Sequence, residues 1–237
     1  MNDKLYSALE EYLERDHISY ADMLDSVRSG RSKPVYASED GAMIFQESSR
    51  LYTIAADSPE AAAPMLDMIE EPDMVLTHLD SIIPEIQKRF EMPGDMYCRQ
   101  FVYDRPRPLT AEAPIGVTLR ELTEDDADFV RANYHNDSLE YILSRIEEGM
   151  LGAMYDGRLS GFIGGHSEGA IGMLFVSSEC RRLGIGEALL SSMVNRRLSH
   201  DRIPFDHVVL GNAASMKLQQ KLGLSLAEKP AVWIFND

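Results

Sequence analysis

The sequence predicts an α/β (α+β) fold in two domains of similar size, and three observations support this prediction. Amphipathic helical patterns and short apolar strand patterns alternate along all 237 residues. Asp104–Ile115, DRPRPLTAEAPI, has three prolines and no apolar periodicity, which is typical of a linker. The length suits one large domain or two small ones. We therefore expect domains over residues 1–108 and 109–237.

The second half shows the predicted order β-α-α-β-β-β-α-β-α-β. Gly116–Leu122 alternates like a strand, and Thr123 followed by acids is a helix start. Ala170–Val176, AIGMLFV, is apolar on both faces, so we expect a central buried strand. The other expected elements are a helix from Asp137 to Gly149, a hairpin over 150–165, a helix with Leu190, Met193, Val194 and Leu198 on one face, a strand from His207, a helix ended by Gly223, and a strand AVWIF that closes the sheet of this half.

The first half shows the order α-α-β-β-β-α-β-α-β. Its first helix begins at Asn2 or Asp3, and Ser19 is the expected cap of the second. Without the first strand of the second half, the two orders coincide. We infer two copies of one fold, with an unrelated α/β domain in the first half as the alternative.

Composition narrows the function classes. The net charge of −16 and the pI near 4.7 disfavour nucleic-acid partners and are compatible with cationic small molecules. Solubility alone is the more ordinary explanation of the charge. The apolar runs are too short to span a bilayer, and the N-terminus lacks the apolar core of a signal peptide. Cys98 and Cys180 form no metal pair or disulfide framework, and the six histidines show no metal spacing. We expect a cytoplasmic monomer or homodimer without a metal.

The stretch CRRLGIGEALL, Cys180 to Leu190, carries the main functional signal. Two arginines lead into Gly184 and Gly186, and an apolar helical pattern follows. Helix N-termini leave unpaired N–H groups and a partial positive charge, so they bind anions. Glycines lack a Cβ and let a ligand approach the backbone. The loop is thus suited to a phosphate group.

Three kinds of phosphate loop compete for this stretch. A Walker A loop needs Lys and then Ser or Thr after its last glycine, whereas Glu187 follows here. A dinucleotide fingerprint needs its glycines directly after the strand, but Gly184 comes eight residues after Val176. The remaining kind has Arg or Gln three residues before Gly-x-Gly, and Arg181 with Gly184 and Gly186 satisfies it.

The segment LFVSSECRRLGIGEALL resembles the signature of the GNAT acyltransferase superfamily, Val-x-Pro-Glu-x-Arg-x-x-Gly-x-Gly, with Ser178 in place of the proline. GNAASMKLQQKLGL resembles the family's last coenzyme-contacting helix, and the element order over 114–237 also fits. The resemblance implies a mixed central sheet with helices on both faces and acetyl-CoA or another short acyl-CoA as co-substrate. It also implies the coenzyme-contacting residues Leu174, Phe175, Val176, Arg181, Arg182, Leu183, Gly184, Ile185, Gly186, Asn212, Ser215 and Lys217.

The resemblance further implies that an amine attacks the thioester directly, in a ternary complex. N–H donors at Phe175 and Val176 would hold the thioester carbonyl and polarise it. The central strand carries no base, so His166 or Glu168 in the preceding hairpin is the candidate, with ordinary turn residues as the alternative.

A second proton role concerns the leaving thiolate. Gln219 stands where the family usually has a tyrosine that protonates the sulfur. An amide can hydrogen-bond sulfur but releases no proton readily. A thiol with a pKa of about 8.5 leaves tolerably as the anion. The missing tyrosine therefore implies a lower catalytic efficiency, or the role moves to another residue such as Tyr155.

In the first half, Ala56–Ala61 (ADSPEA) occupies the place of the phosphate loop. It has no glycine and no arginine, and Asp57 and Glu60 would repel phosphate. We expect a degenerate GNAT-like copy that binds no coenzyme and walls the acceptor site, as in FR47-like and glycine N-acyltransferase-like tandem proteins.

Two functions remain open. The first is an acyltransferase that moves a short acyl group from coenzyme A to a small-molecule amine or a peptide N-terminus. The second is a non-catalytic sensor or regulatory module that binds acyl-CoA.

Overall fold

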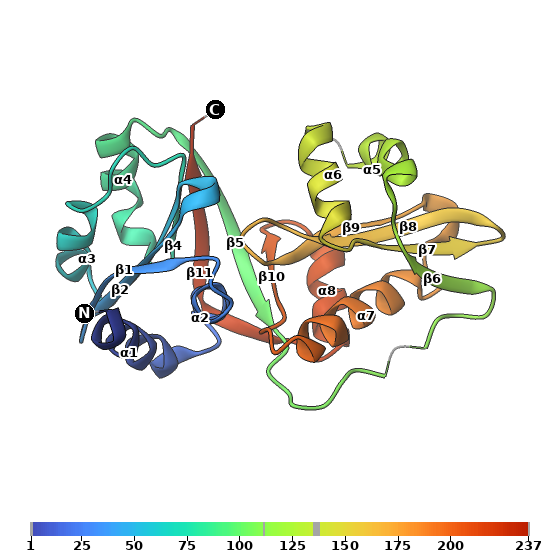
Figure 1. The fold of residues 1–237 in the computed structure, drawn as a ribbon, viewed down its shortest axis with the longest axis horizontal. Coiled ribbons are helices and arrows are strands. Elements are labelled where there is room, and N and C mark those ends of the chain that lie inside the picture. The colour runs from blue at the N-terminus through green and yellow to red at the C-terminus, as the bar shows by residue number, and fades with distance from the viewer. Residues whose placement is uncertain (1, 111, 135–137, 237) are drawn as a thin grey trace. The chain divides into compact units, whose positions relative to one another are not determined.

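A computed structural model describes residues 2–110, 112–134 and 138–236 (Figure 1). The chain divides into two compact units. Unit 1 comprises residues 1–102, 207–216 and 224–237, and unit 2 comprises residues 103–206 and 217–223. The first change from unit 1 to unit 2, after residue 102, lies close to the expected linker. The chain then returns to unit 1 at residues 207 and 224, so a single boundary does not separate the units.

The first half has the expected order of helices and strands, so this prediction is confirmed. Short 3₁₀ turns interrupt the order at Glu14–Asp16, Glu47–Ser49 and Asp80–Ile82. The helices and strands are α1 (Asn2–Leu13), α2 (Ala21–Arg28), β1 (Lys33–Ser38), β2 (Gly41–Gln46), β3 (Leu51–Ala56), α3 (Pro59–Leu66), β4 (Met74–Thr77), α4 (Ile83–Phe90) and β5 (Gly94–Val102).

The second half also has the expected order. Two 3₁₀ turns precede helices, at Glu124–Asp126 and Ser178–Cys180. The helices and strands are β6 (Val117–Glu121), α5 (Ala127–Asn133), α6 (Leu139–Glu147), β7 (Leu151–Tyr155), β8 (Arg158–Gly165), β9 (Ile171–Val176), α7 (Ile185–Ser199), β10 (Phe205–Val209), α8 (Ala213–Lys221) and β11 (Ser225–Phe235).

The strands form two sheets. A four-stranded antiparallel sheet has the order β6-β7-β8-β9, and a seven-stranded mixed sheet has the order β1-β2-β3-β4-β11-β5-β10. The expectation that AVWIF closes the sheet of the second half is wrong. β11 lies between β4 and β5 instead, and Val232 faces Thr77 on one side and Tyr97 on the other. A strand that is apolar on both faces fits the centre of either sheet, so its pattern does not select one.

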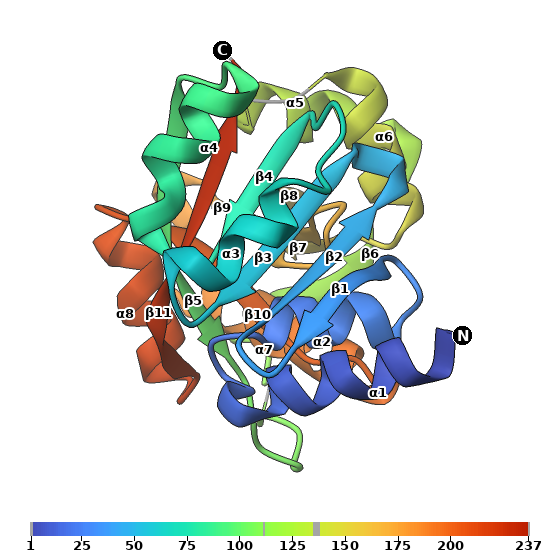
Figure 2. The ribbon, with the colours of Figure 1, turned by 90° about the vertical axis from the view of Figure 1, so that its left-hand side faces the viewer.

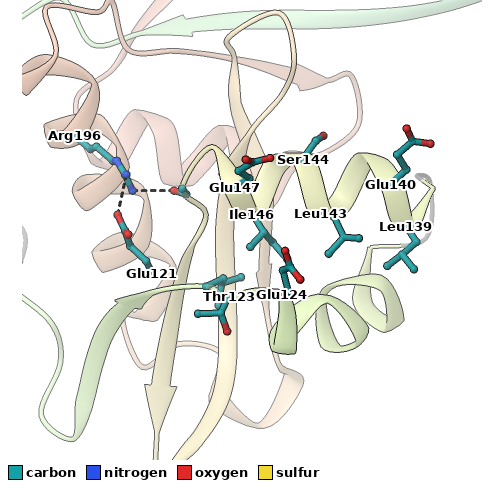
Figure 3. Close-up of a pocket in the computed structure, with 12 residues that line it drawn as sticks. Glu121, Thr123, Glu124, Leu139, Glu140, Leu143, Ser144, Ile146, Glu147 and Arg196 are labelled. Atoms are coloured by element: carbon teal, nitrogen blue, oxygen red, sulfur yellow. Dashed lines mark hydrogen bonds and ion pairs between the residues drawn. The ribbon is translucent and has the colours of Figure 1, made fainter.

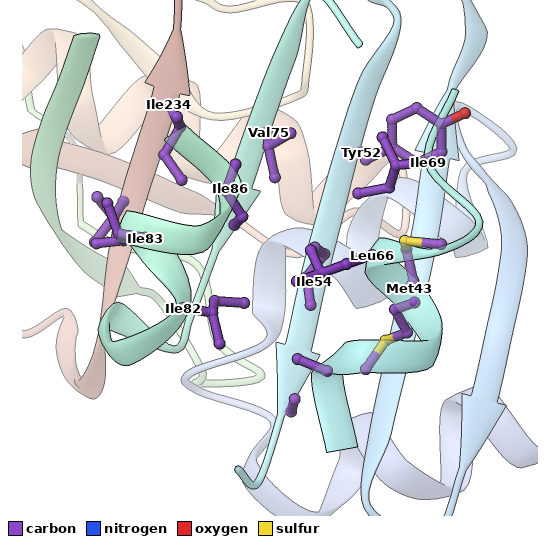
Figure 4. Packing of buried hydrophobic residues seen from close by; sticks show 14 of the residues in the cluster. Met43, Tyr52, Ile54, Leu66, Ile69, Val75, Ile82, Ile83, Ile86 and Ile234 are labelled. Atoms are coloured by element: carbon purple, nitrogen blue, oxygen red, sulfur yellow. The ribbon is translucent and has the colours of Figure 1, made fainter. Parts of the chain in front are cut away.

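The core of unit 1 lies between its sheet and two helices. Figure 2 shows α3 and α4 in front of the sheet, and Figure 4 shows their side chains meeting those of the strands. Leu66 and Ile86 from these helices pack with Ile54, Val75 and Ile234 in one buried cluster. Full burial of a side chain of this size stabilises a fold by about 1.5–3 kcal/mol.

In unit 2 the helices cover both faces of the four-stranded sheet, with α5 and α6 on one face and α7 on the other (Figure 1). Ile142 and Ile146 of α6 pack with Phe162 of β8 and Met173 of β9. Thr123 forms the expected helix start, a capping box with Asp126. The expected start at Asp137 lies outside the described residues.

The expected cap at Ser19 is wrong. The residue before α2 is Tyr20, and no side chain caps this helix. Ser19 is buried, and its Oγ accepts the backbone N–H of Lys229 in β11 instead. Because that partner lies 210 residues further along the chain, local sequence could not indicate it.

Candidate functional site

The start of α7 presents a row of free backbone donors. Gly184 is its N-cap residue, and no side chain caps the helix. Among the described residues, no acceptor takes a hydrogen bond from the backbone N–H groups of residues 182–187, and the helical ladder begins with Ala188 donating to Gly184. Free N–H groups at a helix start are the physical basis of an anion site.

The loop before α7 has an unusual backbone. Arg182 and Gly184 both have a left-handed conformation, with φ of 65° and 85°. Arg181, Arg182 and Leu183 are exposed, whereas Ile185 is buried and anchors the helix start. Nε of Arg181 donates to the carbonyl of Val176 at 3.2 Å, which ties the loop to the end of β9.

Strand β9 carries a bulge that the sequence did not reveal. Its partners on β8 shift register between Phe162 and Gly164, so Met173 and Leu174 oppose one residue of β8. Met173 has φ of 53°, which is rare for a residue with a side chain. Bulges re-aim backbone groups and are frequent beside active sites. Methionine gives no signal for this conformation, so no sequence pattern predicts the bulge.

The register determines which N–H groups of β9 face away from β8. Ser177 donates to Ser160, so the alternation of an antiparallel ladder directs the N–H of Phe175 toward β8. The same alternation turns the N–H groups of Leu174 and Val176 toward the other edge, where β9 ends the four-stranded sheet. This corrects the expected donor pair, because Phe175 uses its N–H within the sheet. The ring of Phe175 stacks on the ring of Phe162, with the two ring centroids 5.4 Å apart.

His166 lies beside β9, as its candidacy for a base requires. A Cβ built on Gly172 would come within 2.5 Å of His166 Nε2, so the imidazole lies directly over this residue. Nδ1 of His166 is 3.1 Å from the hydroxyl of Tyr141 on α6, which orients the ring. Glu168 is half-buried in the turn that follows, between His166 and Ala170. The base role of either residue stays a prediction.

Gln219 is buried within unit 2. Its side chain is 1% exposed, and Nε2 donates to the Asp206 carboxylate. This contact uses one of the two N–H bonds of the amide that was expected to face a departing sulfur, while Oε1 has no hydrogen-bond partner among the described residues. Tyr155, the other candidate, ends β7 with its ring against Gly116.

The remaining coenzyme candidates belong to α8 and its start. Oδ1 of Asn212 accepts the N–H of Ser215 at 3.1 Å, so Asn212 caps this helix within the segment 207–216 of unit 1. Lys217 is exposed on the part of α8 that belongs to unit 2. Leu218 lies beside the first turn of α7, since a Cβ built on Gly186 would be 3.7 Å from the side chain of Leu218.

The corresponding helix start in unit 1 is closed. Ser58 caps α3 by accepting the N–H of Ala61 at 3.2 Å, and Pro59 at the first position has no N–H. Asp57 is engaged by Tyr12 and Arg15. The start of α3 therefore offers fewer free donors than α7 and carries a carboxylate beside them.

An open pocket of about 810 Å³ lies elsewhere in unit 2 (Figure 3). Arg196, the basic residue among those that line it, contacts Glu121 at 2.8 Å and the carbonyl of Gly149 at 2.9 Å. Arg196 lies in the last turn of α7, about 16 Å along the helix from its start. The pocket is therefore separate from the start of α7. Its other lining residues are Leu122, Thr123, Glu124, Leu139, Glu140, Leu143, Ser144, Ile146 and Glu147.

No helix in the described part of the chain is long and apolar enough to cross a membrane. No group of three or more His, Cys, Asp or Glu residues in the same ranges is arranged to hold a metal ion.

Part of the second half of the chain matches a known protein family. Residues 117–224 match the family model described as Acetyltransferase (GNAT) family. No curated protein sequence matches the chain significantly. The family whose model residues 117–224 match generally uses acetyl-CoA and typically transfers the acetyl group to amines.

Solved structures extend the likeness to the whole chain. A Drosophila protein superposes with a TM-score of 0.74 at 16% identity, covering 99% of this chain and 96% of that one. A GCN5-related N-acetyltransferase from Kribbella flavida has a TM-score of 0.58 at 13% identity, covering 93% and 94%. A GCN5-related N-acetyltransferase-like protein from Streptococcus suis has a TM-score of 0.54 at 12% identity, covering 95% and 99%. The expected fold of two GNAT-like domains is confirmed.

Proposed function

We propose that this protein transfers an acetyl or other short acyl group from coenzyme A to an amine by direct attack within a ternary complex. The observation that carries the proposal is the open start of α7, where the N–H groups of residues 182–187 have no acceptor in the described structure. A diphosphate supplies the anionic oxygens that such a helix start binds. Arg182, exposed in the same loop, adds a positive charge.

The outward N–H groups of β9 suit the thioester. Leu174 and Val176 direct their N–H groups away from β8, and the bulge at Met173 separates Leu174 from the regular ladder. As carbonyl carbon becomes tetrahedral, its oxygen gains negative charge, and a preorganised N–H stabilises that charge. Removal of one such donor typically costs about 10²–10³ in rate.

His166 is the base that the geometry favours. The incoming ammonium must lose a proton before its nitrogen attacks the carbonyl carbon, and the Nε2 edge of His166 lies over β9. The nitrogen attacks the carbonyl carbon to form a tetrahedral intermediate, and the C–S bond breaks as this intermediate collapses. The sulfur leaves as the thiolate with the electron pair of that bond, and the second proton of the nitrogen passes to the thiolate or to solvent. Tyr141 holds Nδ1, so the ring keeps its orientation during the proton transfer.

Unit 1 takes no coenzyme in this proposal. Its α3 start is capped by Ser58 and flanked by Asp57, which disfavours a second phosphate group. One chain would therefore bind one acyl-CoA.

The test is an assay of free thiol with acetyl-CoA and a panel of amines that includes polyamines and peptides with free N-termini. Turnover with any amine, together with calorimetric binding of one coenzyme A per chain, is the expected result. Coenzyme binding without turnover across the panel would favour the alternative function, a non-catalytic acyl-CoA-binding module. Absence of coenzyme binding would overturn both.

A further inference from the structure

The first turn of α7 contains an anionic residue that competes for the helix start. With Gly184 as the N-cap, Glu187 occupies the third helical position. A glutamate at this position commonly reaches back to the N–H of the N-cap residue, as in a capping box. The helix dipole also attracts a carboxylate to this end. Glu187 therefore has the reach and the charge to occupy the N–H groups that a phosphate would need.

The structure holds this carboxylate elsewhere. Oε1 of Glu187 forms an ion pair with Nζ of Lys221, the last residue of α8. The side chain of Glu187 is 38% exposed and that of Lys221 is 64% exposed, so this ion pair lies at the surface. Both residues belong to unit 2, and α8 packs beside the start of α7 through Leu218 and Gly186.

We propose that Lys221 is a positioning residue, which keeps Glu187 away from the start of α7 and so leaves the anion site open to coenzyme A. This inference rests on the proposed function, because it concerns the same site. Without Lys221, Glu187 would cap its own helix, and the coenzyme would have to displace it. The free protein would then gain stability while the complex lost affinity.

A double-mutant cycle tests the inference by calorimetric titration of the full chain with coenzyme A at low salt. Lys221→Met removes the charge but keeps an apolar stem of similar length, and we expect the Kd to rise about three- to tenfold, the range that a competing helix cap provides. Lys221→Arg should restore the wild-type Kd. In a Glu187→Gln background, Lys221→Met should change the Kd less than twofold. Lys88→Met, an exposed substitution on α4, is the matched control.

A thermal melt of the same variants without ligand supplies a readout that direct phosphate contact would not change. The melting temperature of Lys221→Met should equal or exceed that of wild type, because the helix gains a cap. If Lys221→Met weakens binding equally in both backgrounds, Lys221 contacts the phosphate itself and the inference is overturned. An unchanged Kd for Lys221→Met also overturns it, while wild-type binding keeps the proposed function. A wild type that binds no coenzyme A would overturn both.

Discussion

The imidazole of His166 lies over Gly172, so close that a Cβ at Gly172 would meet Nε2 at 2.5 Å. A residue of the hairpin turn is thereby placed on the strand whose outer edge carries the free N–H groups of Leu174 and Val176. The contact requires a glycine, because any side chain there would push the ring away. The candidate base and the N–H groups proposed to bind the thioester carbonyl are thus both positioned by β9.

Replacement of the base tests its role directly. We expect His166→Gln to lower kcat by about 10²–10⁴, the usual contribution of a general base, with little change in the Kd for coenzyme A. The measurement is steady-state kinetics with the best amine of the panel, beside calorimetry. A fall of less than threefold at pH 7 would assign His166 to the turn alone and move the base role to Glu168.

Gly172→Ala should displace the imidazole of His166 without changing the chemistry of that side chain. The added methyl group displaces the His166 ring, so we expect kcat to fall at least about tenfold, since a misplacement of about 1 Å can cost about 10² in rate. Gly172→Ala in a His166→Gln background is the control, because the added methyl group then has no imidazole to displace and should lower kcat little further. Equal kcat values for Gly172→Ala and wild type would contradict the proposed placement.

The loop glycines give a prediction for coenzyme binding. Gly184→Asp places a carboxylate at the N-cap position, where it caps the free N–H groups and repels a diphosphate, so the Kd should rise about 10–100-fold. Gly184→Asn is the matched control, because asparagine has nearly the shape of aspartate without its charge and tolerates the left-handed backbone of residue 184, so its Kd should rise less. Calorimetry with coenzyme A measures both. Unchanged affinity in Gly184→Asp would show that the phosphate lies elsewhere.

The order of the elements could be predicted because each depends on a local pattern. Apolar residues with helical spacing, strands such as AIGMLFV and turns such as Asp156-Gly157 are visible within a few residues. The loop before α7 was visible for the same reason, since two glycines and a following helix lie next to one another.

Features that depend on distant partners could not be predicted. The position of β11 depends on which sheet has two strands that can both pair with it, and here these strands are β4 and β5. The donor groups of β9 depend on a bulge at Met173, a residue type with no preference for a positive φ. The burial of Gln219 depends on Asp206, 13 residues earlier in the chain.

The contact of Gln219 with Asp206 predicts a mainly structural role for this glutamine. Gln219→Leu removes a buried hydrogen bond to a carboxylate, which should lower the free energy of unfolding by about 1–3 kcal/mol. Because one N–H of the amide is engaged by Asp206 and an amide releases no proton readily, we expect kcat to fall less than tenfold at pH 7. Urea titration and kinetics measure the two effects. A loss of 10² or more in kcat would restore the leaving-group role to Gln219.

Unit 1 contains a buried contact between the Asp22 carboxylate and the His78 imidazole, whose loss should be visible in the acid range. Nε2 of His78 lies 3.0 Å from Oδ2 of Asp22, and Nδ1 lies 3.0 Å from the carbonyl of Pro230. Burial acts to raise the pKa of Asp22, but the charge and hydrogen bond of His78 more than offset it, so the pKa lies below its usual range. The pair therefore stabilises the fold above about pH 4, the pKa of an unfolded aspartate, and this stabilisation is lost as pH falls through the lowered pKa.

Asp22→Asn should accordingly lower the free energy of unfolding at pH 7 by about 3–5 kcal/mol, the cost of breaking a buried pair on one side. The difference from wild type should shrink below about pH 4, because Asp22 of the unfolded wild-type chain then binds a proton that the folded carboxylate does not bind until the pH falls through its lowered pKa. Urea titrations followed by the fluorescence of Trp233, the single tryptophan, report on unit 1 at each pH. Asp80→Asn at an exposed aspartate of the same unit should leave the curve unchanged. A pH-independent difference between Asp22→Asn and wild type would show that Asp22 stabilises unit 1 through its packing rather than through its charge.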